Sequence, residues 1–487
     1  MNPTIVTAPT VAAADAASPI LVDGDWVPGE GGAFTVLDKF RLVPAATATV
    51  ASEAQVARAV GAAHAAFRRG ALSPYDRGSV LERASRLVEA RHDDLVRTMQ
   101  VEAGFTVSDA GGEVRRCVET LRLSAEEARR LAGEVVPLAG APQQAGRIGF
   151  TMRVPLGVVA AITPFNSPLN TVAHKVGPAL AAGNAVILKP SSHTPLTAAL
   201  LAQALVEAGV PRGFLSVLYG GGQVARALLA EERVRFFAFT GSTEVGREIQ
   251  QAAGLRRTQM ELGSIACTIL CDDARLDTAL PKVVAAGYRK AGQVCTSIQL
   301  LLVHASIASD VEARLAAMVR ELSFGDPGDP GTFVGPVISE EAAVRIERWV
   351  DEALARGARR LAGGPRRRAV VPPTLLASVD ETMSVGCREI FGPVVCVVPF
   401  STLDEAIDRV NATPYGLAAG IFTQRIDDAF AAARRLEVGG VHVNETSSSR
   451  VDLMPYGGSK DSGFGREGPR YAIHEMTEER IVTFALG

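Results

Sequence analysis

The stretch NAVILKPSSHTPLTAALLAQALVEAGVPRGFLSVLYG, from Asn184 to Gly220, decides the fold that the sequence predicts. It begins with a short apolar run, continues through a loop into an amphipathic segment from Pro195 to Gly209, and ends in a second apolar run. Short, continuously apolar strands that alternate with helices are typical of a parallel sheet covered on both faces. The stretch therefore predicts one strand–helix–strand unit of a doubly wound α/β fold.

The same alternation extends to both sides of this stretch. Before it, the apolar run GVVAAIT covers residues 157–163, and a helix is expected at about 168–180. After it, VRFFAFTGS covers residues 234–242 and leads into a helical segment at 244–253. A second series of strands and helices begins near Cys267, so the sequence predicts two such sheets. Ligands of doubly wound sheets lie beyond the carboxyl ends of the strands, where functional residues are expected.

Length and composition restrict the class of protein. A chain of 487 residues is too long for one compact core, so two or three domains are expected. A net charge of −3 and 5% aromatic residues give no basis for binding nucleic acid or a membrane surface. The six cysteines form no disulfide framework or zinc pair, and HExxH is absent, so no metal site is predicted. The start of the sequence does not resemble a secretory signal, and a cytoplasmic protein with reduced thiols is expected.

Three polar features follow apolar strands at the edge where ligands are expected. Asn166, in PFNSPLN, can donate to a developing oxyanion, or it can cap the next helix. Lys189 suits an anion or a ribose hydroxyl, unless it only extends its ammonium to solvent. The turn GSTEVG at 241–246 opens a helix whose N–H groups suit a phosphate, although the pattern also fits a simple connection.

Three further features suit acid–base and nucleophilic chemistry. Glu261, in QMELGS, has apolar neighbours that can raise its pKa and make it a general base, or it can be a salt-bridge partner. Cys295, in KAGQVCTSIQ, is either a nucleophilic thiol or an inert buried cysteine. In REIFGPV, Glu389 suits ribose hydroxyls and Phe391 a ring of a cofactor, or the segment is a turn with a packed aromatic residue.

The order and spacing of these features resemble the aldehyde dehydrogenase superfamily. The matching positions are Asn166, Lys189, the turn at 241–246, Glu261, Cys295 and EIFGP at 389–393, and PYGGSKDSGFGREG at 455–468 resembles the C-terminal signature of that family. The resemblance covers nearly the whole chain, from about Ile20. It implies an α/β fold with two doubly wound parallel-sheet domains, one Rossmann-like for the cofactor and one for the catalytic thiol, and a β oligomerisation arm.

The resemblance also implies a role for each position. Cys295 would attack the aldehyde carbon, and Asn166 with the backbone N–H of Cys295 would hold the oxyanion of the thiohemiacetal. Hydride transfer to a nicotinamide cofactor would leave a thioester, which water activated by Glu261 would hydrolyse. Lys189 and Glu389 would hold the two riboses. The remaining cofactor contacts that the resemblance implies are Ser242 at the pyrophosphate and Thr163, Pro164, Phe165, Ser191, Ser192, Gly241, Gly246, Leu262 and Phe391.

Ser192, the fourth residue of KPSS, bears on the choice between NAD and NADP. In family members that prefer NAD, a glutamate at this position binds the adenosine 2′-hydroxyl. A carboxylate would repel a 2′-phosphate, whereas a serine hydroxyl would not. The sequence therefore predicts that NADP is tolerated or preferred.

The helix that follows Asn166 predicts a polar substrate. Asn170 and His174 are spaced four and eight residues from Asn166 and share its helix face. The resemblance adds Arg289, Thr296 and Arg450 to the same tunnel. A polar tunnel would leave groups unpaired around an alkyl chain, so we expect a small polar aldehyde, hydroxylated or anionic, as for lactaldehyde- and semialdehyde-type members. The alternative is that these side chains satisfy one another and water.

The resemblance implies domain boundaries and an assembly. The expected parts are a flexible N-terminus at 1–18, a nucleotide-binding domain at 19–136 and 157–264, a catalytic domain at 265–461, and an oligomerisation arm with the C-terminal strand at 137–156 and 462–487. The last strand is expected to join a sheet of this chain or of a partner, in a homodimer or homotetramer. The alternative functions are those of a CoA-acylating aldehyde dehydrogenase and of a catalytically silent scaffold with the same fold. Glu261 disfavours the first, and the presence of both Cys295 and Glu261 disfavours the second.

Overall fold

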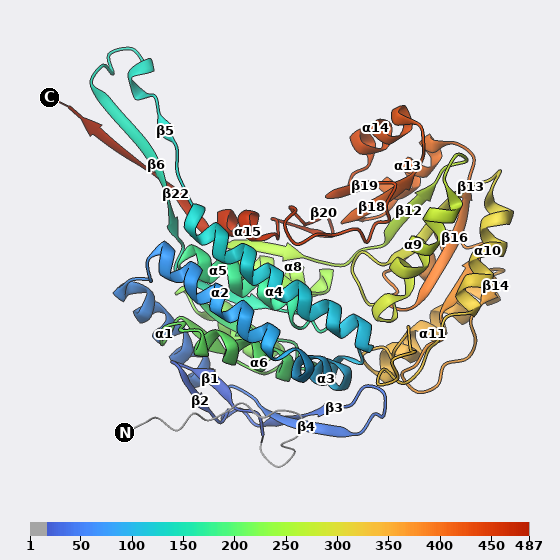
Figure 1. Ribbon diagram of the computed structural model, residues 1–487, viewed down its shortest axis with the longest axis horizontal. Helices are drawn as coiled ribbons and strands as arrows, with labels where there is room; N and C mark the ends of the chain where they lie inside the picture. The colour runs from blue at the N-terminus through green and yellow to red at the C-terminus, as the bar shows by residue number, and fades with distance from the viewer. Residues whose placement is uncertain (1–16, 487) are drawn as a thin grey trace.

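The structure, a computed structural model, describes residues 17–486 and contains two large β-sheets (Figure 1). The strands of the first sheet lie in the order β2 (Asp25–Val27), β1 (Ile20–Val22), β9 (Leu215–Val217), β8 (Ala185–Lys189), β7 (Val158–Ile162), β10 (Val234–Thr240), β11 (Arg257–Glu261) and β21 (Gly463–Phe464). The central strands β9, β8, β7, β10 and β11 are parallel to one another. Strand β1 pairs antiparallel with β9, and β21 pairs antiparallel with β11. The predicted α/β class is confirmed, but the sheet is mixed because segments from both ends of the chain extend it.

Helices from the first half of the chain pack around this sheet. They are α1 (Glu53–Arg69), α2 (Pro74–Ala90), α3 (His92–Ala103), α4 (Val107–Arg130), α5 (Asn170–Ala182), α6 (Pro195–Glu207), α7 (Gly222–Ala230) and α8 (Thr243–Ala253). Local sequence fixes their starts: Ser52 and Gln55 form a capping box at α1, and Ser73 caps α2 just before Pro74. Helices α1, α5 and α6 contact the strands directly, and α2 and α4 pack outside α5.

The second sheet has the order β14 (Arg359–Ala362), β15 (Thr374–Ala377), β16 (Val394–Phe400), β13 (Ile298–His304), β12 (Ala266–Leu270), β18 (Ala418–Phe422) and β19 (Gly440–Val443). All neighbouring strands are parallel except β14, which pairs antiparallel with β15. The accompanying helices are α9 (Leu276–Tyr288), α10 (Ala308–Arg320), α11 (Glu340–Ala355), α12 (Ser384–Cys387), α13 (Leu403–Ala412) and α14 (Ile426–Arg435). Helix α9 ends at Tyr288, and the 3₁₀ turn η2 (Arg289–Gly292) follows.

The carboxyl ends of the first sheet's central strands lie level with one another. Ile162 of β7 is paired with Lys189 of β8 and with Phe239 of β10, and Thr240 is paired with Glu261 of β11. The chain builds outward from β7 through β8 to β9, and then continues on the other side with β10 and β11. Strand order thus reverses between β7 and β10, which is where doubly wound sheets open a crevice for ligands.

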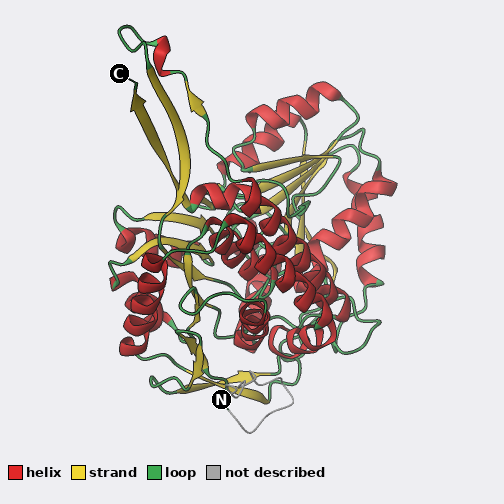
Figure 2. Cartoon of the chain, turned by 60° about the vertical axis from the view of Figure 1, so that its left-hand side comes forward, coloured by secondary structure: helices red, strands yellow, loops and turns green. Residues whose placement is uncertain are grey.

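An arm of antiparallel strands projects from the body of the molecule (Figures 1 and 2). It consists of β5 (Val135–Val136), β6 (Arg147–Pro155) and β22 (Thr477–Ala485), with the 3₁₀ turn η1 (Leu138–Gly140) between β5 and β6. Strand β22 pairs with β6 along its length, from Thr477 opposite Pro155 to Ala485 opposite Arg147. The C-terminal strand therefore joins a sheet of its own chain.

Short elements complete the chain. They are the hairpin of β3 (Ala33–Leu37) and β4 (Pro44–Thr49), the pair of β17 (Tyr415–Gly416) and β20 (Ser459–Lys460), and α15 (Pro469–Glu475). Residues 1–16 of the expected flexible N-terminus lie outside the described part, whereas Ser18 is buried and its N–H donates to Thr47 O (2.8 Å). The expected domain boundaries stay a prediction. Within residues 17–486, no helix is both long enough and apolar enough to cross a membrane.

Candidate active site

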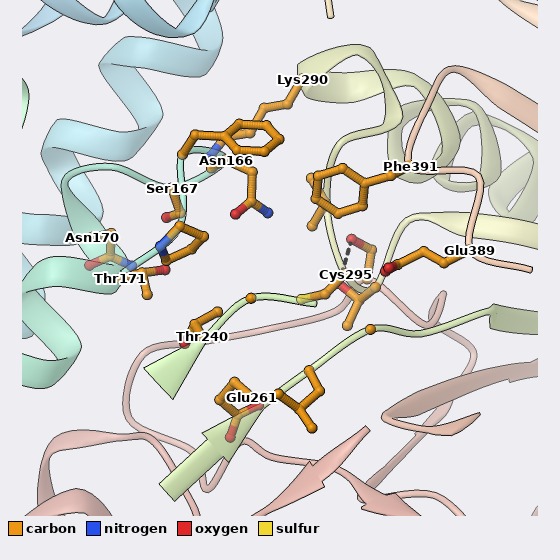
Figure 3. Close-up of a pocket in the computed structure, with 18 of the residues that line it drawn as sticks. Asn166, Ser167, Asn170, Thr171, Thr240, Glu261, Lys290, Cys295, Glu389 and Phe391 are labelled. Carbon is orange, nitrogen blue, oxygen red and sulfur yellow. Dashed lines mark hydrogen bonds between the residues drawn. The ribbon is translucent and has the colours of Figure 1, made fainter. Parts of the chain in front are cut away.

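A cavity of about 470 Å³ lies between the carboxyl edge of the first sheet and the segment before β13 (Figure 3). Most of the predicted site residues line it, and these are Pro164, Phe165, Asn166, Asn170, Gly241, Ser242, Glu261, Leu262, Arg289, Cys295, Thr296, Glu389, Phe391 and Arg450. The predicted residues outside its wall are Thr163, His174, Lys189, Ser191, Ser192 and Gly246. Segments far apart in the sequence thus converge on one space.

The backbone before Cys295 adopts an uncommon conformation. Lys290, Ala291 and Gly292 have φ angles of 52°, 52° and 69°, in the left-handed region that non-glycine residues seldom occupy. A Cβ at Gly292 would lie 2.0 Å from Gly392 O, so this position accepts only glycine. The turn then closes with a bond from Ser297 N–H to Val294 O (2.8 Å). Such a conformation persists only where surrounding contacts hold it.

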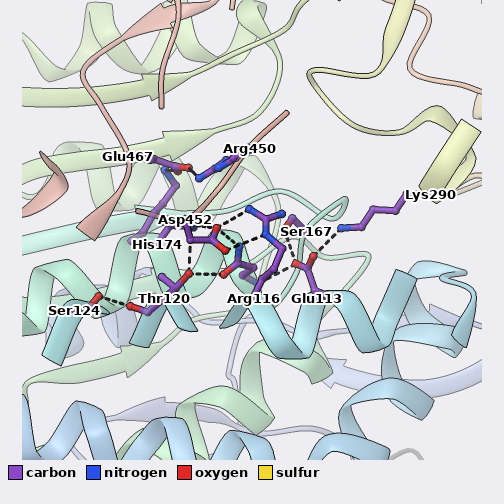
Figure 4. Close-up of polar contacts among 12 residues, drawn as sticks. Glu113, Arg116, Thr120, Ser124, Ser167, His174, Lys290, Arg450, Asp452 and Glu467 are labelled. Carbon is purple, nitrogen blue, oxygen red and sulfur yellow. Dashed lines mark hydrogen bonds and ion pairs between the residues drawn. The ribbon is translucent and has the colours of Figure 1, made fainter. Parts of the chain in front are cut away.

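A buried ion pair supplies these contacts. Lys290 Nζ lies 2.7 Å from Glu113 Oε2 on α4 and also donates to Asn166 O (3.1 Å). The other Glu113 oxygen accepts from the Asn170 N–H (2.9 Å) and from the Ser167 hydroxyl (Figure 4). Both charged side chains are buried, and removing one partner of such a pair costs about 3–5 kcal/mol. One ion pair therefore fixes the Cys295 turn relative to the loop after β7.

Cys295 is partly exposed to the cavity, and its thiol is neutral at physiological pH in this arrangement. Burial among protein groups raises the pKa of the thiol to about 11. A hydrogen bond with Tyr456 and the charge of Arg450 act to lower that pKa, and the carboxylates of Glu261 and Glu389 act to raise it. The sulfur is thus surrounded by groups of both signs. A base is needed to ionise this sulfur.

Asn166 points an amide toward the thiol and does not cap a helix. The N-cap of α5 is Leu169, so the alternative role for Asn166 as the cap is not seen. Its Nδ2 donates to Gln293 O (2.9 Å), which uses one of the two amide N–H groups. Figure 3 shows the Asn166 amide directed into the cavity on the side of Cys295. The second N–H is placed to donate to an oxygen bound near the sulfur.

Glu261 is a buried carboxyl group at the end of β11. Its Oε1 accepts a hydrogen bond from Gln259 Nε2 (3.3 Å), and its Oε2 has no partner within residues 17–486. Burial and repulsion by the nearby Glu467 raise the pKa of Glu261 well above its usual value, against the opposite influence of Lys175 and Arg450. A carboxyl group with a raised pKa and a free oxygen in a cavity suits general acid–base chemistry.

The strand ends beside this cavity carry unpaired polar groups. The side chain of Lys189 is buried, burial lowers the pKa of its ammonium to about 8, and it has no ion-pair or hydrogen-bond partner among the described residues. The buried hydroxyls of Thr163 and Thr240 are also without partners in that part of the chain. Leaving buried donors unpaired is costly, so these groups fit a ligand with hydroxyl and phosphate oxygens.

The turn after β10 leaves room for close approach. Ser242 caps α8 by accepting the Val245 N–H (3.4 Å). A Cβ at Gly246 would lie 2.4 Å from the side chain of Leu262, so this glycine lets α8 pack against the segment after β11. Ser191 and Ser192 lie in the loop after β8, where the Ser192 hydroxyl donates to Gly220 O (3.2 Å). The amino end of α8, which lines the cavity through Ser242, is an environment that favours an anion.

Glu389 and two aromatic rings form the opposite wall. Glu389 Oε1 accepts the Ser264 N–H (2.9 Å), and burial raises the pKa of this carboxyl group to about 7. The rings of Phe391 and Phe165 meet edge to face with centroids 5.8 Å apart. The wall offers a flat apolar surface next to a hydrogen-bond acceptor, which suits a heterocyclic ring and a ribose.

Two of the predicted substrate residues are engaged elsewhere. His174 is fully buried outside the cavity, with Nε2 2.8 Å from Asp452 Oδ1. The Asn170 amide donates to the same oxygen (3.1 Å) and accepts from the Thr120 hydroxyl (2.8 Å). Asp452 thus binds both side chains, and Figure 4 shows it beside His174. On this face of α5 the polar side chains therefore form hydrogen bonds with other protein groups, as in the alternative considered above. Asn170 also lines the cavity.

Arginine side chains line part of the cavity. Arg116 donates two hydrogen bonds to Asp452 (3.1 and 2.6 Å), and Arg450 pairs with Glu467 (2.9 Å). Arg289 differs from both, since its Nη2 donates to the Ser448 hydroxyl (2.6 Å) and it has no carboxylate partner within residues 17–486. Burial and the proximity of Arg116 lower the pKa of Arg289, as expected for a cation without a counter-charge.

Comparison with known proteins identifies the fold and the site together. A model of the aldehyde dehydrogenase family matches residues 26–482. The chain belongs to the aldehyde dehydrogenase family. It is therefore an enzyme of the oxidoreductase class, and the resemblance that the motifs indicated is confirmed.

Members of the family with similar sequence or structure cover almost the whole chain. The 3-sulfolactaldehyde dehydrogenase of Priestia megaterium is 44% identical over 468 residues, which are 96% of this chain and 98% of that protein. Aldehyde dehydrogenase 21 from Physcomitrella patens, in complex with the reaction product succinate, superposes with a TM-score of 0.93 at 37% identity, covering 96% of this chain and 98% of its own. The NADP-dependent glyceraldehyde-3-phosphate dehydrogenase from Bacillus halodurans, complexed with NADP, gives a TM-score of 0.94 at 32% identity, covering 97% and 100%.

Several residues of the cavity wall had no role predicted from the sequence. They include Arg116, Lys290, Arg345, Ser448, Tyr456 and Glu467. Tyr456 and Glu467 lie within the C-terminal signature. The resemblance indicated that this segment matters, but it gave no role to either residue. Arg116 lies in the middle of α4 with no local pattern to distinguish it from the other arginines of that helix.

Proposed function

We propose that this protein oxidises a small polar aldehyde that carries an anionic group to its carboxylic acid, with NAD or NADP as the oxidant. The observation that carries the proposal is one cavity that a thiol, an amide, a buried carboxyl group and arginine side chains all line. The sulfolactaldehyde enzyme and the succinate complex among the relatives support an anionic substrate.

The chain's own groups account for the covalent steps. The Cys295 thiol passes its proton to the Glu261 carboxylate, and the sulfur attacks the carbonyl carbon. The oxygen of the resulting thiohemiacetal receives hydrogen bonds from the Asn166 amide and the backbone N–H of Cys295. A bound nicotinamide dinucleotide supplies the hydride acceptor. Glu261, once it has lost its proton, activates water to hydrolyse the thioester and release the acid.

The residues beside the cavity fit a nicotinamide dinucleotide. The unpaired ammonium of Lys189 would bind ribose hydroxyls, and Glu389 would accept from those of the other ribose. The N-terminus of α8 with Ser242 would hold the pyrophosphate. The apolar wall with Phe165 and Phe391 would contact the nicotinamide ring. Thr163, Pro164, Ser191, Gly241, Gly246 and Leu262 would complete the contacts.

Arg289 is the proposed contact for the anionic group of the substrate, with Thr296 beside it through Ser448. We expect the catalytic efficiency with succinate semialdehyde or another acidic aldehyde to exceed that with butanal. Replacing Arg289 with methionine removes the charge and should lower the efficiency for the acidic aldehyde by about 10- to 100-fold, since a hydrogen bond to a charged group contributes about 1.5–3 kcal/mol. Butanal serves as the internal control and should change little. Faster turnover of hexanal or benzaldehyde than of any hydroxylated or acidic aldehyde would contradict this substrate class.

The cofactor preference can be tested at Ser192. We expect kcat/KM with NADP to equal or exceed that with NAD, because no carboxylate lies at this position to repel a 2′-phosphate. Ser192→Glu should shift the ratio toward NAD by about tenfold or more, and Ser192→Ala, which adds no carboxylate at the same position, serves as the control. Absorbance of the reduced cofactor at matched concentrations measures both. A strong preference of the unaltered enzyme for NAD would exclude the prediction.

We also propose that the protein forms a homodimer or homotetramer through its arm. The arm exposes apolar side chains on both long strands, among them Ile148, Phe150, Ile481 and Phe484. Exposed apolar surface on a projecting strand pair is typical of a contact between chains.

A further inference from the structure

Tyr456 touches the reactive sulfur from a distant part of the chain. Its phenol oxygen lies 2.7 Å from Cys295 Sγ, and the side chain is buried with 7% of its surface exposed. It belongs to the loop between β19 and β20, and backbone hydrogen bonds in both directions with Glu467 fix it there (3.1 and 2.6 Å). Neither the proposed mechanism nor the cofactor contacts use this hydroxyl.

Hydrogen-bond satisfaction indicates which atom donates. Within residues 17–486, the Cys295 sulfur is the only side-chain partner of the Tyr456 hydroxyl. If the thiol donated, the phenol O–H would be left buried and unpaired, and an unpaired buried hydroxyl is costly. If the phenol donates, only the S–H is left without an acceptor, and S–H is a weak donor that loses little. The phenol is therefore the donor and the sulfur the acceptor.

The surroundings strengthen this donor. The guanidinium carbon of Arg450 lies 3.7 Å from the centroid of the Tyr456 ring, within range of a cation–π contact. A cation over the ring withdraws electron density and makes the O–H a better donor. Arg450 is held in place by Glu467, which also pairs with the buried Lys175 (3.1 Å; Figure 4 shows Arg450 and Glu467). The phenol is thus oriented by a fixed cation behind it.

We propose that Tyr456 is a further catalytic residue, whose O–H donates to the Cys295 sulfur and stabilises its thiolate before attack. This inference rests on the proposed function, since it concerns the same nucleophile. The phenol keeps its own proton, and the proton of the thiol goes to Glu261. When the carbon–sulfur bond forms, the negative charge moves from sulfur to the substrate oxygen. The hydrogen bond from Tyr456 to sulfur then weakens, and the hydrogen bond from the Asn166 amide to the substrate oxygen strengthens.

The pH dependence of alkylation tests the inference. The rate of inactivation by iodoacetamide follows the thiolate fraction of Cys295, which the charged or titratable groups facing the sulfur also influence, namely Glu261, Arg289, Glu389 and Arg450. Tyr456→Phe leaves all of these in place. We expect it to raise the pKa of the thiol by about 1–2 units, the equivalent of one hydrogen bond to a charged group, and to slow alkylation by about 10- to 100-fold below that pKa.

A matched control comes from another buried tyrosine. Tyr288 donates to Thr374 O (3.0 Å) at the end of α9 and does not contact the sulfur, so Tyr288→Phe should leave the thiol pKa unchanged. If Tyr456→Phe does not fold, Tyr456→3-fluorotyrosine keeps the ring, strengthens the donor and should lower the thiol pKa. An unchanged or lowered thiol pKa in Tyr456→Phe, or an unchanged or raised one in Tyr456→3-fluorotyrosine, would overturn the inference. Its failure leaves aldehyde oxidation by the unaltered enzyme intact, whereas an enzyme that oxidises aldehydes without Cys295 would refute the proposed function itself.

Discussion

Replacing Cys295 with alanine is expected to abolish the oxidation of every aldehyde by this enzyme. All six cysteines lie in the described part of the chain, and of these only Cys295 lines the cavity. Four others are buried in the protein interior, and Cys387 is exposed elsewhere. Removing a covalent nucleophile costs on the order of 10⁴- to 10⁶-fold in rate, because the remaining groups only bind and polarise the substrate. Absorbance of the reduced cofactor at saturating acidic aldehyde measures the loss.

A control cysteine separates chemistry from general damage. Cys387→Ala removes the exposed thiol and should keep turnover within about twofold of the unaltered enzyme. Iodoacetamide should inactivate both the unaltered protein and Cys387→Ala, with one added group on Cys295 by mass spectrometry. Turnover of Cys295→Ala within tenfold of the unaltered enzyme would refute the covalent mechanism and with it the proposed function.

The sequence was sufficient for those parts of the site that depend on the strands. Residues that follow a buried parallel strand must emerge at one edge of the sheet, so Asn166, Glu261 and the turn at 241–246 could be placed together before any coordinates. Register then brings their strands level, as the pairing of Thr240 with Glu261 shows. Cys295 does not follow a strand of this sheet, so the strand argument does not place it. Its assignment came from the order of the family motifs.

The sequence was not sufficient for contacts that depend on packing between distant segments. A spacing of four residues correctly places Asn170 and His174 on one face of α5, but it does not say what covers that face. The covering group is Asp452, which lies 278 residues after His174 and satisfies both side chains. Lys290 was part of the quoted Cys295 segment, yet its left-handed backbone and its pairing with Glu113 depend on α4.

Glu261→Gln is expected to stop the enzyme after one turnover. Glutamine keeps the shape of the side chain and its contact with Gln259, but it cannot take a proton from water. Steady-state kcat should fall by about 10²- to 10⁴-fold, the usual contribution of a general base. Each active site should still produce one reduced cofactor in a burst, and the thioester should be visible as an acyl adduct on Cys295. The exposed Glu248 on α8 provides a control, since Glu248→Gln should turn over normally.

The rate and pH dependence of this burst separate the two roles assigned to Glu261. The carboxylate form is the base, and its pKa is raised above the usual value, so turnover of the unaltered enzyme should rise as pH increases through that pKa. The rise should be absent in Glu261→Gln. If Glu261 also accepts the thiol proton, the burst of Glu261→Gln should be slower than the first turnover of the unaltered enzyme. If Glu261 acts only on water, the burst of Glu261→Gln should keep that rate, and only later turnovers should be lost. Steady-state turnover near that of the unaltered enzyme, with no burst, would exclude Glu261 as the hydrolytic base, and turnover that depends on added CoA would then indicate transfer of the acyl group to CoA.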